Sequence, residues 1–562
     1  MFQNASFGHP PLHGTIGLIG PAARGPIPHR PERATLRTRR HNRGRGFALE
    51  DNLVMKTCSP ATTPNRADFG FDQPYSSLGS EFFSAVRPFG LPAPRLSLVS
   101  EDASRLLGLH LESTDPEALQ SWAELFSGTT LPAGCEPIST VYSGHQFGNW
   151  AGQLGDGRAH LLGELDAPDA TQNCGYARWE VQLKGAGRTP YSRHGDGRAV
   201  LRSSIREFLC SEAMWHLGIP TTRALCLVTS SLPVARERME TAAVVTRLAP
   251  SFIRFGHFEH FSYSGQHAAL RRLVDWTIAR IDPACADAAN PALALLQGVV
   301  ARTARLMAQW QCVGFIHGVM NTDNMSMLGW TLDYGPFAFM DGFDPAHTPN
   351  TTDRAGRYAW GRQPAIARWN LLALAQAMLP LLGEPQDAMD AVAAFEPQFS
   401  QAMRSQLQNK LGLGALQGGD DDLVDAWLAA MAENQADWTL SFRRLGSLSS
   451  DSDSPIPEAL QSLFTIRPQQ FQAWVADYRQ RLRQQDHADA ERKLAMDLVN
   501  PRFVLRHHLA QHAIAQAEAG DFSAARELMA VLRYPYAQQP EHAAYAAAPP
   551  QDAEAPALSC SS

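Results

Sequence analysis

The spacing of apolar residues predicts both helices and strands in the first part of the chain. Residues 94–126 and 200–217 carry apolar positions three to four residues apart, which is typical of helices, and Glu207 lies near the border of the second apolar stripe. Residues 179–184 alternate strictly between polar and apolar, so we expect a strand that ends at Lys184. The glutamine and the glutamate two and four positions before Lys184 share its polar face.

Later segments change from strand to helix patterns. Short apolar runs at 224–228 and 242–247 predict two more strands. Beyond about residue 255 the spacing is predominantly helical, through 270–281, 293–310 and 369–382. Strands first and helices afterwards predict an α+β protein with two unequal lobes, one of mixed sheet plus helices and one mainly helical.

Composition shifts divide the chain further. Residues 1–66 are rich in Pro, Gly, His and Arg without periodicity, so we expect a disordered extension. Because Met55 offers an internal start, a wrongly assigned start is the preferred interpretation and a transit peptide the alternative. We then expect a first lobe over 67–255, a second over 256–543, and a flexible tail over 544–562 that contains Cys560.

Overall composition and charge exclude several classes of protein. With 562 residues, 44% hydrophobic and 19% charged, the chain is too apolar for a disordered protein. The net charge is −7, but residues 1–50 hold eight arginines against two glutamates, so the remainder carries about −13 and predicts no nucleic-acid partner. No run of 18 apolar residues occurs, so we expect no membrane span.

The eight cysteines are scattered and form no C-x-x-C pair. This spacing argues against a zinc site or a disulfide framework. Scattered cysteines in a long chain are typical of a reducing compartment, so we expect a cytoplasmic location.

A glycine loop precedes the predicted strand of residues 179–184. Its residues are Gly155, Asp156 and Gly157, followed by Arg158. Glycines let backbone N–H groups approach phosphate oxygens, and the arginine adds a cation at the same place. The alternative is an ordinary turn, because most Gly-x-Gly triplets have no ligand.

Lys184 at a strand end and Glu207 on the following helix have the layout of a nucleotide-binding lysine held by a helix carboxylate. Protein kinases use such a pair to position phosphates. The alternative is two separate, solvated surface charges. A dense polar insertion that includes Asp196 and Gly197 lies between them and favours the first interpretation.

The third cluster contains Asp323 and Asn324, with Asp333 nine residues later. Asp323 could accept a proton from a hydroxyl group, and Asn324 and Asp333 offer the hard oxygen ligands that Mg²⁺ prefers. The alternative is a turn-rich hairpin, since Asn, Asp and Gly are ordinary turn formers.

Two arginines and three histidines complete the candidates. Arg247 and Arg254 lie where the strand region passes into the helical one, which is the cleft of a two-lobed nucleotide enzyme, and either could hold a phosphate. His145, His194 and His317 have no partner at useful spacing, so we interpret them as structural.

Three long motifs together resemble the selenoprotein O family, called YdiU in bacteria. They are Tyr-Ser-Gly-His-Gln-Phe-Gly at 142–148, the run from 183 to 189 continued to 207, and Asn-Thr-Asp-Asn at 321–324 with Asp-Tyr-Gly-Pro at 333–336. The likeness covers about residues 67–562. It implies a bacterial protein with a protein-kinase-like fold that binds ATP in a reversed orientation. It further implies transfer of AMP to Ser, Thr or Tyr hydroxyls of proteins, with UMP from UTP described for bacterial members.

The resemblance also implies roles for single positions. Asp323 matches the proton acceptor, Asn324 and Asp333 match the ligands of Mg²⁺ or Mn²⁺, and Glu207 matches the helix partner of the phosphate-binding lysine. The residues matching nucleotide contacts are Gly155, Gly157, Arg158, Lys184, Asp196, Gly197, Arg247, Arg254 and Asp333.

The chain departs from the family in two places. Residues 1–66 have no counterpart in the family. In addition, no cysteine lies between Cys312 and Cys560, so Cys560 cannot form a disulfide with a cysteine just after the 333–336 motif. We expect a protein adenylyltransferase that uses ATP and Mg²⁺. The alternatives are an ordinary kinase that transfers the γ-phosphoryl group and a catalytically silent pseudokinase.

Overall fold

The computed structural model of the protein describes residues 70–169, 174–414, 417–485, 487–550 and 558–559. All of them belong to the second of two units into which the chain divides, residues 62–562. The predicted extension over 1–66 and Cys560 lie outside the described residues.

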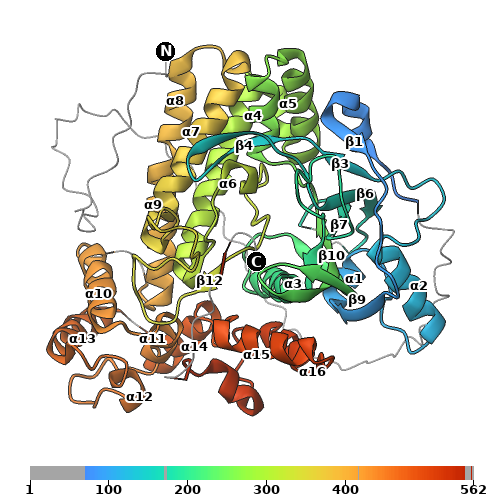
Figure 1. Cartoon of the computed structure of the whole chain (residues 1–562). Coiled ribbons are helices and arrows are strands. Elements are labelled where there is room, and N and C mark those ends of the chain that lie inside the picture. The colour runs from blue at the N-terminus through green and yellow to red at the C-terminus, as the bar shows by residue number, and fades with distance from the viewer. Residues whose placement is uncertain (1–69, 170–173, 415–416, 486, 551–557, 560–562) are drawn as a thin grey trace, which may run out of the picture. The chain divides into compact units, whose positions relative to one another are not determined.

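The main sheet has eight strands in the order β1-β3-β6-β7-β10-β9-β2, with β8 paired to β10 (Figure 1). Its strands are β1 Phe83–Ala85, β2 Arg95–Val99, β3 Ile138–Thr140, β6 Ala159–Asp166, β7 Arg178–Lys184, β8 Ala199–Val200, β9 Arg223–Ala235 and β10 Met239–Ala249. The prediction of a mixed sheet is wrong, because every ladder between these strands is antiparallel. The sequence neighbours β6 and β7, and β9 and β10, pair directly and need no crossover.

Two small antiparallel pairs, sixteen α-helices and six short 3-10 helices make up the rest of the described elements. The pairs are β4 Ser143–Gln146 with β5 Asn149–Gln153, and β11 Phe315–Ile316 with β12 Ala338–Phe339. The helices are α1 Glu101–Leu106, α2 Pro116–Ser127, α3 Leu201–His216, α4 Phe255–Tyr263, α5 His267–Ile281, α6 Pro291–Val313, α7 Gln363–Leu382, α8 Pro385–Ala393, α9 Phe395–Lys410, α10 Asp420–Asn434, α11 Trp438–Leu445, α12 Glu458–Gln461, α13 Pro468–Leu482, α14 Asp489–Val499, α15 His507–Glu518 and α16 Ser523–Leu532.

These elements confirm an α+β protein, with strands concentrated before residue 250 and helices after it. The predicted helices at 200–217, 270–281, 293–310 and 369–382 are confirmed by α3, α5, α6 and α7. The helical prediction for 94–126 is wrong at its start, where β2 pairs antiparallel with β9. Leu96 and Leu98 are two residues apart, which is the strand period, so the helical spacing of the residues after 100 was extended too far toward the N-terminus.

Helix α3 is fixed to the sheet by a buried ion pair. Glu212 on α3 accepts hydrogen bonds from Arg223 Nε at 2.8 Å and Nη2 at 2.7 Å, and from the backbone N–H of Ala224 at 3.0 Å. The glutamate and the arginine are both buried. Helices α15 and α16 also contact α3, so the end of the chain supports the same helix.

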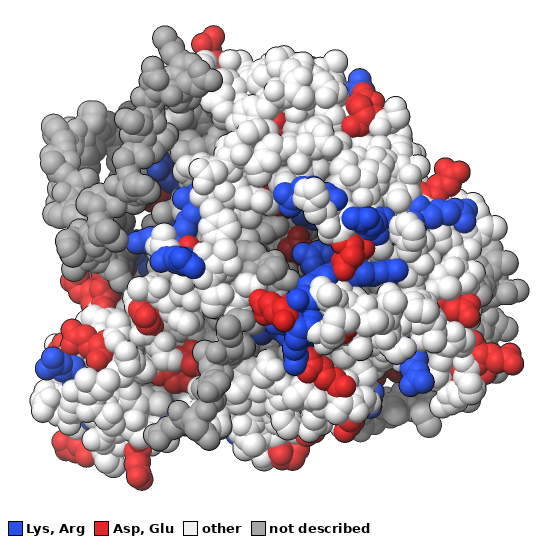
Figure 2. All heavy atoms as spheres, viewed as in Figure 1, with Lys and Arg blue, Asp and Glu red and all other residues white. Residues whose placement is uncertain are grey.

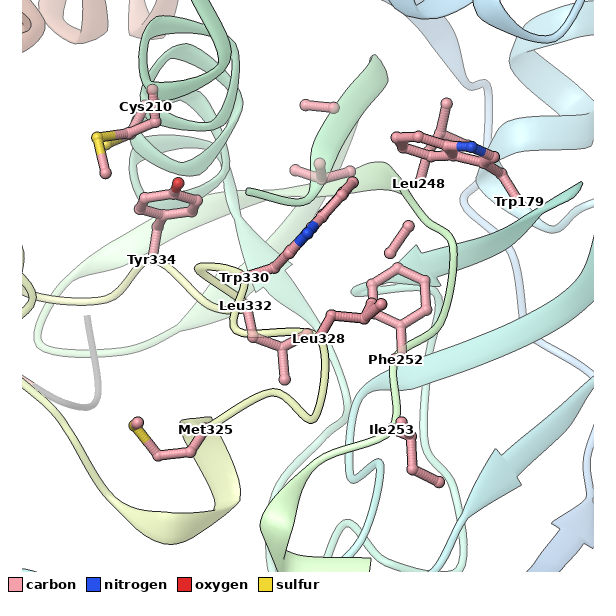
Figure 3. Close-up of a cluster of buried hydrophobic side chains, with 14 of the residues drawn as sticks. Trp179, Cys210, Leu248, Phe252, Ile253, Met325, Leu328, Trp330, Leu332 and Tyr334 are labelled. Carbon is pink, nitrogen blue, oxygen red and sulfur yellow. The ribbon is translucent and has the colours of Figure 1, made fainter. Parts of the chain in front are cut away.

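A buried apolar cluster holds the segment between residues 325 and 334 (Figure 3). Leu328, Trp330 and Leu332 of this segment belong to the same buried cluster as Trp179 of β7 and Leu248 of β10, and the ring centroids of Trp179 and Trp330 lie 5.5 Å apart. Burying each large side chain stabilises the fold by about 1.5–3 kcal/mol. The cluster therefore fixes the residues that flank this segment against the sheet.

One described helical stretch, Trp360–Leu382, is long and apolar enough to cross a membrane by length and composition alone. Half of it is buried inside the structure, and α7 contacts α4, α6 and α8. A core helix passes the same test, so this stretch is weak evidence for a membrane span.

The segment predicted as a flexible tail contains one well-packed residue. Leu558 is 4% exposed, and its carbonyl oxygen accepts hydrogen bonds from the backbone N–H and the hydroxyl of Thr351, each at 2.8 Å. Leu558 is therefore packed into the fold.

We expect Glu212→Ala to lower the free energy of unfolding by about 3–5 kcal/mol, because it leaves the buried guanidinium of Arg223 without a counter-charge. Glu518→Ala is the matched control, since Glu518 pairs with the exposed Arg238 and should cost less than about 1 kcal/mol. Urea unfolding of the two variants measures both values. Equal losses would contradict the anchoring role of Glu212.

Glu180 of β7 predicts a dependence of stability on pH. Burial raises the pKa of Glu180 to about 8, although hydrogen bonds donated by the Phe252 N–H and the Ser251 hydroxyl lower it. The folded state therefore keeps the proton up to about pH 8, whereas an unfolded chain releases it near the usual pKa of 4.5. Stability falls as pH rises between these values, by at most about 1.4 kcal/mol per pH unit.

Glu180→Gln removes this titration. We expect the variant to gain stability relative to the wild type as pH rises from about 5 to 8, measured by urea unfolding at each pH. Parallel pH curves for the two proteins would show that Glu180 does not carry this effect.

Candidate active site

All twelve sequence-predicted site residues line one cavity of about 680 Å³. They are Gly155, Gly157, Arg158, Lys184, Asp196, Gly197, Glu207, Arg247, Arg254, Asp323, Asn324 and Asp333. They come from the glycine loop between β5 and β6, from β7, from the loop between β7 and β8, from α3 and β10, from the residue that precedes α4, and from a short helical turn, Thr322–Asn324, with the segment after it. Figure 2 shows Lys and Arg next to Asp and Glu around a hollow in the middle of the visible face.

Lys184 is the point where three of these elements meet. Its Nζ lies 2.5 Å from Glu207 Oε2 of α3 and 3.1 Å from Asp333 Oδ1. The side chains of Lys184 and Glu207 are 15% and 4% exposed. They are therefore a largely buried ion pair and not two separate solvated charges.

Two arginines join the same network. Arg247 Nη1 lies 2.5 Å from Asp333 Oδ1 and 3.3 Å from Glu207 Oε1, and its Nε donates to Gln182 Oε1 at 3.1 Å. Arg254 Nη1 lies 3.2 Å from Asp333 Oδ2. Both oxygens of the Asp333 carboxylate therefore contact cations.

The charge of Asp333 follows from these contacts. Burial alone would raise its pKa, but Lys184, Arg247 and Arg254 outweigh that effect and hold the pKa of Asp333 well below its usual range. Asp333 is ionised at neutral pH.

Asp323 has a different environment although it lies in the same cavity. Burial raises the pKa of Asp323 to about 6, while Arg254 and a hydrogen bond from Gln146 Nε2 to Oδ2 at 3.2 Å lower it. Its other oxygen, Oδ1, is buried and has no hydrogen-bond partner among the described residues. A carboxylate with one uncommitted oxygen and a pKa near 6 can accept a proton at neutral pH.

The cavity also offers oxygens suited to a hard cation. The amide Nδ2 of Asn324 donates to the carbonyl of Val319 at 2.9 Å, which leaves the amide oxygen as an acceptor. Together with the Asp333 carboxylate, this amide oxygen offers the hard ligands that suit Mg²⁺ or Mn²⁺. No cluster of three or more His, Cys, Asp or Glu side chains suited to a metal occurs within the described part of the chain.

The glycine loop is shaped by protein contacts as well as by any ligand. Gly155 has φ +141°, and a Cβ there would lie 2.4 Å from Cγ of Tyr191. A Cβ on Gly157 would lie 2.9 Å from the carbonyl oxygen of Tyr191. The intervening Asp156 is buried and accepts hydrogen bonds from Thr140.

The predicted residues nearer the surface differ in their partners. The carboxylate of Asp196 is bound by Arg236 at 2.8 and 2.9 Å, which lowers its pKa. Gly197, with φ +69°, approaches the backbone of Gly187 closely. Arg158 is exposed and forms no ion pair with a described carboxylate.

The three histidines that we interpret as structural differ in their position relative to the cavity. His317 is buried and stacks on Trp310, with ring centroids 5.2 Å apart, and burial lowers its pKa to about 4. His317 and His194 both line the cavity, whereas His145 lies outside its lining and pairs with Glu259.

Sequence reasoning missed three residues that contact the predicted ones. Gln182 holds Arg247, Gln146 holds Asp323, and the ring of Tyr142 lies 4.9 Å from the guanidinium of Arg254. The strand alternation already placed Gln182 on the face of Lys184, and this was the only local signal for it.

Comparisons with known proteins agree with the resemblance seen in the motifs. A family model described as protein adenylyltransferase SelO matches residues 66–533. The protein nucleotidyltransferase YdiU of Paraburkholderia xenovorans (strain LB400) is 53% identical over 504 residues, covering 87% of this chain and 95% of that protein. Proteins of the same name from Herminiimonas arsenicoxydans and Burkholderia pseudomallei (strain K96243) are each 50% identical, covering 87% of this chain and 96% and 95% of theirs. The chain belongs to the SelO family of protein adenylyltransferases.

Proposed function

We propose that this enzyme transfers AMP from ATP to Ser, Thr or Tyr hydroxyls of proteins and releases pyrophosphate, with UTP as a possible second nucleotide donor. The observation that carries the proposal is the contact of Lys184 with both Glu207 and Asp333 in the cavity that also contains Asp323. One site thus combines phosphate-binding cations, carboxylates for a metal and a proton acceptor.

We further propose a two-lobed, protein-kinase-like arrangement of the fold. A glycine loop, a strand lysine, a helix glutamate, a loop aspartate and a second aspartate follow one another in the order that kinases use. The division into lobes over 67–255 and 256–543 remains a prediction.

Lys184, Arg247 and Arg254, with the exposed Arg158, would hold the phosphates. Seven cationic and five acidic side chains line the cavity, so cations are in excess. Charge-assisted hydrogen bonds from such groups are stronger than neutral ones. We assign the remaining nucleotide contacts to the backbone of the glycine loop and to Asp196 and Gly197.

Asn324 and Asp333 would hold Mg²⁺ or Mn²⁺, which neutralises phosphate charge when bound. Asp333 also lies against the nucleotide in this assignment. Its low pKa keeps it ionised and able to bind a cation at neutral pH.

Asp323 would accept the proton of the target hydroxyl as that oxygen attacks the α-phosphorus. The new bond joins the hydroxyl oxygen to the α-phosphorus, and the bond from that phosphorus to the β-bridging oxygen breaks. Pyrophosphate leaves with the bonding electrons, and the cations that hold the β- and γ-phosphates stabilise the charge that develops on it.

The partners in this proposal are acceptor proteins and a nucleotide, without nucleic acid or a membrane. We also propose a cytoplasmic location. Six cysteines among the described residues are free thiols, five of them buried, as a reducing compartment would leave them.

We expect label to enter a generic protein acceptor, or the enzyme itself, from ATP labelled at the α-phosphorus and not from ATP labelled at the γ-phosphorus. Purified enzyme with Mg²⁺ and each nucleotide in parallel provides the measurement. Label from the γ-position alone would make the protein a kinase. Label from α-labelled UTP but not from ATP would identify UTP as the nucleotide donor. No label from either nucleotide would favour a silent nucleotide-binding protein.

Asp323→Asn should lower α-label transfer by about 10²–10⁴-fold, because the amide cannot accept the proton. Thermal stabilisation by ATP should persist, because Asp323 is not a phosphate ligand in this assignment. Full activity of the variant would refute the role of Asp323.

Lys184→Met should lower kcat/KM by about 10²–10³-fold, because it removes one cation from the charge that develops on the leaving group. Lys493→Met is the matched control, since Lys493 forms an ion pair on the surface within α14. The same initial-rate assay compares the two variants. A similar loss in both would exclude a specific role for Lys184.

A further inference from the structure

The β4–β5 hairpin carries the motif at 142–148, most of which the nucleotide site does not use. Its backbone binds the turn that bears Asp323: the His145 N–H donates to Thr322 Oγ1 at 2.7 Å, and the Phe147 N–H donates to Asn321 Oδ1 at 3.0 Å. Gln146 reaches Asp323 itself at 3.2 Å. The hairpin is therefore built against the proton acceptor.

Side chains on the two faces of β4 contact different parts of the protein. Successive side chains of a strand lie on opposite faces. Gln146 lines the nucleotide cavity, whereas the neighbouring His145 lies outside that lining and contacts rings on the other side. The strand thus connects the Asp323 site to a second surface.

That surface is an aromatic patch made of His145, Trp150, Tyr263 and Trp369. The ring centroids of Trp150 and Tyr263 lie 4.7 Å apart, and the His145 ring lies 5.1 Å from Trp150 and 5.3 Å from Trp369. Trp150 is 44% exposed and Tyr263 is 45% exposed. Exposed Trp and Tyr rings are enriched where proteins bind other proteins.

A buried carboxylate holds the patch in place. His145 Nδ1 lies 2.5 Å from Glu259 Oε1, and Glu259 is fully buried on α4. The rings are therefore preorganised, which lowers the entropic cost of binding a partner.

One edge of the patch is cationic. The guanidinium of Arg357 lies 5.1 Å from the ring centroid of Trp369 and is close to Gly148 at the hairpin turn. Among the ion pairs of the described ranges, none joins Arg357 to a carboxylate, so its charge is available to a partner. This edge complements acidic side chains.

We propose that the hairpin and the aromatic patch form the docking surface for the acceptor polypeptide. An extended segment places an apolar or aromatic side chain on Trp150 and Tyr263 and an acidic side chain beside Arg357, and it presents its hydroxyl to Asp323. This inference rests on the proposed function, because it names the acceptor for the same site. The hairpin is hydrogen-bonded to the turn that bears Asp323, so a polypeptide bound on the hairpin lies near the proton acceptor. This arrangement favours the acceptor polypeptide as the partner.

The test uses a library of peptides with one Ser, Thr or Tyr and varied flanking residues, incubated with wild-type enzyme and ATP labelled at the α-phosphorus. We expect labelled peptides to be enriched in acidic and aromatic flanks. For the best peptide, the double variant Trp150→Ala/Tyr263→Ala should raise KM by about tenfold or more, as loss of an interface hot spot does, and change kcat little. Arg357→Ala should abolish the acidic preference.

Tyr534→Ala is the matched control, because Tyr534 is 58% exposed and lies outside the patch. The affinity of each variant for ATP, measured by calorimetry, confirms an intact nucleotide site. Unchanged peptide KM and flank preference in the patch variants would overturn the docking surface and leave the proposed function standing. Failure of the wild type to label any peptide, with ATP still bound, would instead refute both.

Discussion

The cavity depends on one cluster of opposite charges contributed by β7, α3, β10, the residue that precedes α4, and the segment after the turn at 322–324. Removing an ion from water costs several kcal/mol unless an opposite charge and hydrogen bonds replace the water. Asp333 obtains these from Lys184, Arg247 and Arg254, and Glu207 shares the first two. Lys184 and Glu207 already compensate each other, but Asp333 meets its three cations only when β7, β10 and the start of α4 are in place, so the network favours their alignment.

The rest of the fold supplies that alignment through apolar packing and a second ion pair. The segment from 325 to 334 is held by its buried side chains against the sheet, which limits the movement of Asp323 just before it and of Asp333 near its end (Figure 3). Helix α3 is fixed by Glu212 and Arg223 one and a half turns beyond Glu207. The charged side chains of the cavity are thus positioned by the Glu212–Arg223 ion pair and by leucine and tryptophan side chains that lie outside the cavity lining.

Much of this site was predictable from local pattern, because Lys184 ends an alternating strand, Glu207 borders a helical stripe, and glycines and aspartates mark turns. The contacts of Gln146 with Asp323 and of Gln182 with Arg247 were not, because each joins residues at least 65 positions apart. The strand β2 was missed for a different reason: Leu96 and Leu98 alternate as in a strand, but the helical spacing of the residues after them was extended over them. Local spacing indicates which face of an element is apolar, but not which distant element covers it.

The glycines of the motif at 142–148 illustrate how sequence signals combine protein packing with ligand binding. A Cβ on Gly144 would lie 3.1 Å from Thr322 Oγ1 and 3.2 Å from Asp323 Cβ, and one on Gly148 would lie 3.1 Å from the guanidinium of Arg357. These glycines let the hairpin approach the turn that bears the proton acceptor on one side and the arginine loop on the other. Gly155 similarly makes room for Tyr191. The glycine-rich stretches of this protein therefore indicate close packing of the backbone against other protein atoms. Only the charged side chains that converge on the cavity distinguish a nucleotide site from a tightly packed turn.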